Sequence, residues 1–193
     1  MSMKGWAITA GLGAEAGPVA VMMMPRQNPD GAEDNLRRIP TWGLKDPNTD
    51  FAQLETKEVQ NIVRMMNLFQ PHVVIDNHEG NVAVDNDPVY HGYMLTNARY
   101  STRNSEAFRD LGQTMVLDPH NTLRQRDFDV RYIDNIVNGK GIGTILGYAG
   151  NQGILAFLIE SPGILHGRNN YERRVVGSMI CITTYYDYLK ENL

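Results

Sequence analysis

Two patterns of apolar and polar positions recur along the chain, and together they predict an α/β fold. Between Leu54 and Phe69 the apolar residues return at the spacing of one helix face, at Val59, Ile62, Val63 and Met66. Pro71 then ends this helix. Residues 72–76 contain the apolar run Val73-Val74-Ile75 and show no clean alternation, which is typical of a strand buried on both faces of a parallel sheet.

The same patterns predict the remaining elements. We expect a helix over about 103–115, a strand over 154–159 that ends at Glu160, and a short strand over 19–24 between two prolines. A last helix is predicted over 171–189, with its inward face formed by Val175, Val176, Met179, Ile180, Thr183 and Tyr186. The glycine-rich segment 139–153 is predicted to be a mobile loop. Because strands alternate with helices, we expect a mixed, largely parallel sheet flanked by helices, in one domain over residues 1–193.

Composition narrows the class of protein. The chain has 193 residues, of which 42% are hydrophobic and 21% charged, so it can bury a sizeable core. The net charge of −4 argues against bulk electrostatic binding of nucleic acid or of an anionic membrane. A single cysteine, Cys181, excludes an intrachain disulfide framework. We find no transmembrane run and no signal peptide, so a cytoplasmic protein and the mature fragment of an exported one both remain open.

Ionisable residues stand where two of the predicted strands end. His78 and Glu79 follow the strand over 72–76, and Glu160 follows six apolar residues. In open α/β sheets this position favours active sites. A carboxylate at the end of a buried strand is also expensive unless it is paired or used. The alternatives are that Glu160 emerges into solvent and that His78 is a hydrogen-bonded loop histidine.

The order of several motifs resembles the zinc carboxypeptidase family, the carboxypeptidase A-like metallopeptidases. These motifs are Asn-Pro-Asp-Gly at 28–31, Arg37 with Arg38, Gly-x-x-Asp-x-Asn at 43–48, Asp-Asn-His-Glu at 76–79 and Phe-Leu-Ile-Glu at 157–160. The resemblance extends from about Met24 to Leu189. It implies a hydrolase-like carboxypeptidase architecture in truncated form, a zinc cofactor and a peptide substrate that loses its C-terminal residue.

The resemblance also implies roles for individual residues. By this match His78 and Glu15 are zinc ligands, and Glu160 is the general base that takes a proton from metal-bound water. Arg38, with Arg37 as the alternative, polarises the scissile carbonyl. Asn48 and Tyr148 contact the substrate, Asn48 at its C-terminal carboxylate and Tyr148 as a mobile tyrosine.

The chain departs from the family pattern in three places. No His-x-x-Glu occurs anywhere, and Leu12 stands where the family has the ligand histidine. Thr49 follows Asn48 where the family has an arginine. The segment between Glu15 and Asn28 is also short for the family, so we expect a fragment, a shortened homologue or the product of an internal deletion. Sheet edges near 19–24 and 72–76 should then be left open, which predicts a homo-oligomer or a chain that needs a missing N-terminal region.

Three functions are consistent with these residues. The first is a zinc metallocarboxypeptidase, supported by the motif order and by Glu160. The second is a catalytically degenerate relative that keeps the fold and binds a peptide or partner, supported by Leu12 and Thr49. The third is a zinc amidase that acts on small acylated amino acids, which the Asn-Pro-Asp-Gly turn makes less favourable.

Overall fold

The computed structural model describes residues 21–24, 26–34, 36–80, 92–98, 106–133, 141–163 and 170–192. The chain divides into two compact units, which are described separately. The N-terminal unit comprises residues 1–70 together with 186–193, and the central unit comprises residues 71–185.

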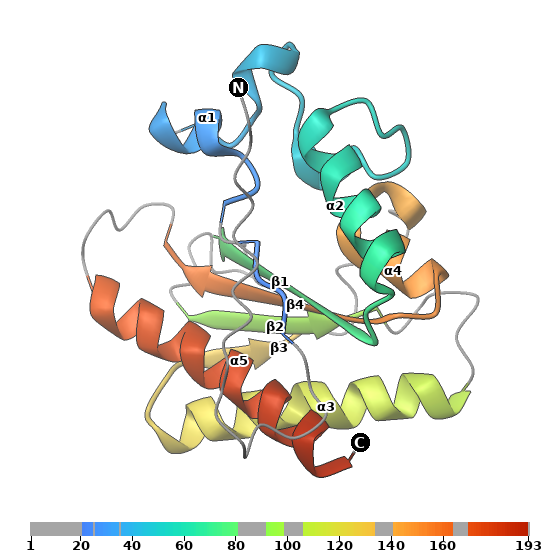
Figure 1. Ribbon diagram of the computed structural model, residues 1–193. Coiled ribbons are helices and arrows are strands. Elements are labelled where there is room, and N and C mark those ends of the chain that lie inside the picture. The colour runs from blue at the N-terminus through green and yellow to red at the C-terminus, as the bar shows by residue number, and fades with distance from the viewer. Residues whose placement is uncertain are drawn as a thin grey trace. The chain divides into compact units, whose positions relative to one another are not determined.

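The central unit is built on a four-stranded sheet (Figure 1). Its strands, in spatial order, are β1 (Val73–Gly80), β4 (Leu155–Pro162), β2 (Tyr93–Asn97) and β3 (Val130–Tyr132). β1 pairs with β4 in parallel and β2 pairs with β3 in parallel, whereas β2 and β4 are antiparallel. The predicted mixed, largely parallel sheet flanked by helices is therefore confirmed.

Helices cover both sides of this sheet. α3 (Glu106–Gln125) and the part of α5 (Tyr171–Asn192) that belongs to the central unit lie on one face (Figure 1). η3 (Gly141–Gly143) leads into α4 (Ile145–Asn151), which lies on the other side. The core beneath α5 is aromatic: Phe157 stacks on Tyr185 with ring centroids 4.5 Å apart. The hydroxyl of Tyr93 donates a hydrogen bond to the backbone carbonyl of Arg174, which fixes α5 to the sheet.

The register of β1 against β4 decides which side chains meet. His78 pairs with Glu160, and Gly80 pairs with Pro162. Alternate residues of a strand point to opposite faces. Phe157 on β4 and Glu79 on β1 contact α5. His78 directly precedes Glu79, and Glu160 lies three residues after Phe157, so both point to the face away from α3 and α5.

The N-terminal unit consists of short helices and one longer helix. These are α1 (Pro29–Glu33), η1 (Pro40–Trp42), η2 (Pro47–Thr49) and α2 (Lys57–Phe69). α2 buries Val59, Ile62, Val63 and Met66, the stripe that the sequence predicts. The helix ends at Gln70, which takes a left-handed conformation, directly before Pro71.

A buried carboxylate organises the start of α2. Asp50 is 3% exposed, and its Oδ2 accepts hydrogen bonds from the backbone N–H and the hydroxyl of Thr56, both at 2.8 Å. Its Oδ1 accepts the backbone N–H of Glu55 at 3.1 Å. Thr56 in turn caps the helix by accepting the N–H of Val59. Both oxygens of this buried carboxylate therefore accept hydrogen bonds.

Several predicted boundaries are wrong. β1 runs on to Gly80 and β4 to Pro162, so His78, Glu79 and Glu160 lie within strands and not in the loops after them. The segment expected to be a glycine-rich loop contains α4 instead. Burial of Ile145, Leu146 and Ala149 in this helix offsets the low helix propensity of its glycines. Residues 21–24 form neither helix nor strand, and residues 19 and 20 lie outside the described part.

Two helices also differ from expectation. α3 ends at Gln125, ten residues beyond the predicted end at 115. It continues through Pro119, which is buried. Of the predicted inward residues of α5, Ile180 is buried, but Val175, Val176 and Met179 are exposed. The buried face also includes Gly177, Cys181 and Tyr185, which were not predicted. The helix period is present, but the sequence alone does not show that small residues mark the face that packs on the sheet. None of the described helices is long and apolar enough to cross a membrane.

Candidate active site

The structure brings together two of the residues singled out in the sequence, His78 and Glu160. They are register partners on neighbouring parallel strands. His78 Nδ1 lies 3.4 Å from Glu160 Oε1, and the two side chains are 24% and 14% exposed, respectively. Both lie near the carboxyl ends of β1 and β4. In open α/β sheets ligands bind at this edge.

A second carboxylate holds the other side of the imidazole. Asp76 precedes His78 by two residues on β1, so it faces the same side of the sheet, and it is 3% exposed. Its Oδ2 lies 3.0 Å from His78 Nε2. Burial lowers the pKa of His78, but hydrogen bonds to Asp76 and Glu160, together with their charges, outweigh burial and raise this pKa to about 10. Without a metal the group is thus a protonated imidazole between two carboxylates.

These three side chains have the chemistry of a metal site. Imidazole nitrogen and carboxylate oxygen are the donors that zinc takes alongside thiolate. Because Asp76 faces Nε2, the lone pair available for a metal is on Nδ1, which points to Glu160. The described residues contain no group of three histidine, cysteine or acidic side chains arranged to hold a metal ion. His78 could therefore supply one zinc donor through Nδ1, and the other ligands would have to come from elsewhere.

The opposite face of β1 carries a structural ion pair. Glu79 Oε1 accepts a hydrogen bond from Arg174 Nη1 of α5 at 2.8 Å. The arginine side chain is 7% exposed and the glutamate 57%. A buried guanidinium needs such a partner. Glu79 therefore fixes the end of β1 to α5 and lies on the other side of the sheet from His78.

Arg38 and Asn48 lie in the N-terminal unit, on either side of a loop that an antiparallel bridge between Ile39 and Lys45 closes. Arg37, the alternative to Arg38, is engaged: its Nε donates to Asp46 Oδ2 at 2.8 Å. The other oxygen of Asp46 accepts the backbone N–H of Asn48 at 3.0 Å. Within the described residues Arg38 is exposed and makes no ion pair or hydrogen bond. The choice of Arg38 over Arg37 as the carbonyl-polarising arginine stays a prediction.

The Asn-Pro-Asp-Gly motif has a clear structural role. Asn28 Oδ1 accepts the N–H of Gly31 at 3.0 Å, which caps α1, and Pro29 occupies the first helical turn. The Asn28 amide donates to the carbonyl of Arg37 at 3.3 Å. A Cβ at Gly31 would overlap the Asn28 amide and lie 2.5 Å from the carbonyl oxygen of Leu36. The motif thus ties α1 to the arginine-bearing segment.

Of the two remaining predicted residues, the structure describes only Tyr148. Tyr148 lies on α4, the helix that leads into the amino end of β4. Its assignment to substrate binding stays a prediction. Glu15, and Leu12 beside it, lie outside the described residues. The assignment of Glu15 as a zinc ligand therefore also stays a prediction.

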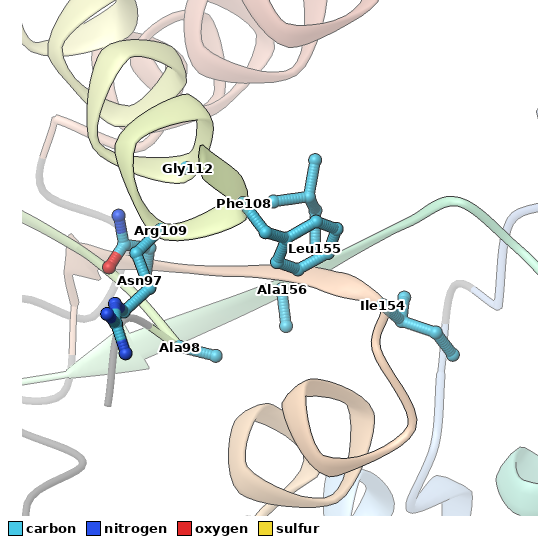
Figure 2. Close-up of a pocket in the computed structure, with 8 residues that line it drawn as sticks. All are labelled: Asn97, Ala98, Phe108, Arg109, Gly112, Ile154, Leu155 and Ala156. Carbon is cyan, nitrogen blue, oxygen red and sulfur yellow. The ribbon is translucent and has the colours of Figure 1, made fainter. Parts of the chain in front are cut away.

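A small cavity lies at the opposite end of β4 from Glu160, between α3 and the first residues of the strand (Figure 2). Its lining includes Asn97, Arg109, Gly112 and Leu155. The cavity volume is about 10 Å³, which is room for about one water molecule. It is too small for an amino acid, so it does not compete with the His78–Glu160 pair as a substrate site.

Sequence reasoning missed the part played by Asp76. The signal is the strand period: residues two apart share a face, so an acidic residue at 76 had to lie beside His78 once β1 was taken to continue past 76. Ending the strand at 76 removed that inference.

The fold is that of bacterial metallo-carboxypeptidases. A metallo-carboxypeptidase from Burkholderia cenocepacia superposes with a TM-score of 0.66 at 18% identity, over 93% of this chain and 50% of that one. A metallo-carboxypeptidase from Pseudomonas aeruginosa, solved with (2-guanidinoethylmercapto)succinic acid, superposes with a TM-score of 0.61 at 17% identity, over 86% of this chain and 44% of that one. The chain thus spans about half the length of these structures. No family model and no curated protein matches the sequence.

Proposed function

We propose that the chain is a zinc-dependent metallocarboxypeptidase that removes C-terminal residues from peptides. The observation that carries this proposal is the His78–Glu160 pair. An imidazole and a carboxylate face each other at 3.4 Å across parallel strands, in a chain with a carboxypeptidase fold.

Each of these residues has its own role in the proposed reaction. His78, with Glu15, would hold the zinc ion. A bound zinc ion would supply a water of pKa about 7 and polarise the scissile carbonyl. Glu160 accepts the proton of the attacking water and delivers it to the leaving amine. Arg38 stabilises the charge that develops on the carbonyl oxygen, and Asn48 and Tyr148 bind the substrate.

Two variants test the roles in this mechanism. Glu160→Gln keeps the shape and removes the base, so turnover of a blocked dipeptide should fall by roughly two to four orders of magnitude while bound zinc is unchanged. Glu172→Gln, at an exposed position on α5, is the matched control and should retain turnover. Full activity of Glu160→Gln would refute the base. Loss of zinc would make Glu160 a ligand.

Metal content tests the ligand directly. His78→Ala should abolish stoichiometric zinc binding measured by mass spectrometry, whereas His72→Ala, at an exposed position just before β1, should leave it unchanged. Unchanged zinc in the His78 variant would place the site elsewhere. A substrate whose C-terminus is amidated serves as the second control, since a carboxypeptidase should cleave it poorly.

Leu12 and Thr49 favour a second candidate, a catalytically degenerate protein that binds peptides. In this case a metal-replete protein should contain no zinc and cleave nothing, yet bind peptides with a free carboxylate. The third candidate, an amidase, would hydrolyse an acylated amino acid faster than a peptide. Both can be measured with the same protein preparation.

We also propose that the chain self-associates. β1 lies at an edge of the four described strands, with β4 on only one side. An open strand edge presents unpaired backbone N–H and C=O groups to another chain. Sedimentation equilibrium should show a species larger than 21.7 kDa. A stable monomer at all concentrations would contradict this.

A further inference from the structure

Gly80, the last residue of β1, lies directly beside the Glu160 carboxylate. It follows His78 by two residues, so both point to the same face of the sheet. A Cβ built on Gly80 would overlap Glu160 Oε2 and lie 2.9 Å from Glu160 Cδ and 3.6 Å from Glu160 Cβ. The carboxylate thus occupies the space that any side chain at position 80 would need.

The backbone does not require glycine at this position. Among the described glycines, only Gly43 and Gly153 have a positive φ, so Gly80 has a conformation that other residues adopt. Glycine within a strand also weakens it, because it adds chain entropy and packs nothing. Gly80 therefore contributes the absence of a side chain, since its backbone conformation does not require glycine.

The space left by the missing side chain of Gly80, the seat, accommodates the observed orientation of the Glu160 carboxylate. One carboxylate oxygen, Oε1, faces His78 Nδ1 at 3.4 Å, and the other, Oε2, lies over Gly80. A methyl group at position 80 would fill the space that Glu160 Oε2 occupies, so the carboxylate would have to rotate away from this orientation. A base displaced by about 1 Å from the reacting water loses on the order of 10²-fold in rate.

We propose that Gly80 is a positioning residue, whose lack of a side chain seats the Glu160 carboxylate against His78. The catalytic part of this inference rests on the proposed function, in which Glu160 is the base. The seat itself does not, because it concerns only the contact between positions 80 and 160.

The first experiment uses Gly80→Ala in the full chain. With a blocked dipeptide as substrate, kcat should fall on the order of 10²-fold, while KM and the zinc content stay those of the parent protein. Gly112→Ala is the matched control: it adds the same methyl on α3, where the nearest atom is 3.5 Å away, and should leave kcat unchanged. An unchanged kcat in Gly80→Ala would overturn the positioning role.

The second experiment needs no activity. In the parent protein the methyl of Gly80→Ala and the Glu160 carboxylate compete for one space, so the carboxylate has to move. In a Glu160→Ala background the competing group is gone, so the same substitution should change the melting temperature more favourably than it does in the parent protein. Equal effects in both backgrounds would overturn the seat. If the parent cleaves no peptide but this coupling is present, the proposed function fails and the seat stands.

Discussion

Replacing Asp76 with asparagine changes one charge beside His78 and leaves the shape of the side chain nearly the same. In the parent protein Asp76 Oδ2 lies 3.0 Å from His78 Nε2 and is shielded from water. Burial lowers the pKa of His78, and the two carboxylates raise it to about 10. Asp76→Asn removes the carboxylate with the closer contact, so the imidazolium loses half of its compensating charge.

The size and sign of the effect follow from this geometry. An opposite charge at hydrogen-bonding distance is worth roughly 1 to 3 pH units, so the pKa of His78 should fall by about that amount. The corresponding loss of folding free energy is about 1 to 4 kcal/mol. Because the folded-state pKa is raised, this stability is complete below pH 6.5 and disappears as pH rises from 6.5 through about 10. The difference between parent and variant should therefore be largest near pH 6 and shrink towards pH 10.

The assay is a pH titration of the histidine ring nitrogens by NMR on zinc-free protein, with His78 assigned from a His78→Gln spectrum. Urea unfolding at pH 6 and pH 9 gives the free energies. Glu79→Gln is the matched control, because it removes a charge from the neighbouring residue on the opposite face, where Arg174 is its partner. The reasoning is refuted if Asp76→Asn leaves the pKa of His78 where it was, or if Glu79→Gln lowers it as much.

Three further predictions concern stability and reactivity. Asp50→Ala strands the three donors that its carboxylate accepts, so the free energy of unfolding followed by tryptophan fluorescence should fall by about 3 kcal/mol, against little change for exposed Asp34→Ala. Gly31→Ala should lower the free energy of unfolding by about 1 to 3 kcal/mol in the same assay, because its Cβ overlaps the Asn28 amide. Burial raises the pKa of the Cys181 thiol to about 12, so a thiol reagent at pH 8 should label it only after unfolding. Rapid labelling of the native protein would contradict that placement. As pH rises above 9 towards 12, the unfolded state ionises this thiol first and stability should decline.

Long periodic segments carried most of what the sequence could predict about the fold. The stripe on α2 and the apolar run of β4 are set by local patterns, and the structure has both. β2 was missed because it is a central strand buried at every position, so it shows no alternation and is only five residues long. The buried face of α5 was predicted only in part for a similar reason: Gly177 packs against the ring of Tyr93, and no local pattern predicts that contact.

The candidate site, like the fold, could be predicted from the sequence only in part. His78 and Glu160 could be singled out because each carries an ionisable group shortly after an apolar run. That they face each other depends on the register of β1 against β4, which no short stretch of sequence determines. The role of Gly80 depends on the same register, whereas that of Asp76 depends only on the continuation of β1 past residue 76.

The pairing of β1 with β4 also has a kinetic consequence. β2, α3, β3 and α4 all lie between the two strands in the chain, so His78 and Glu160 meet only after a long loop has closed. Parallel pairings of this kind form slowly, because chain entropy must be lost before the contacts are gained. A slip of one residue would turn Glu160 to the side of the sheet that packs on α3 and α5. Recovery of the His78–Glu160 contact during refolding should therefore be among the last events, and it would report native strand alignment more strictly than recovery of helix content.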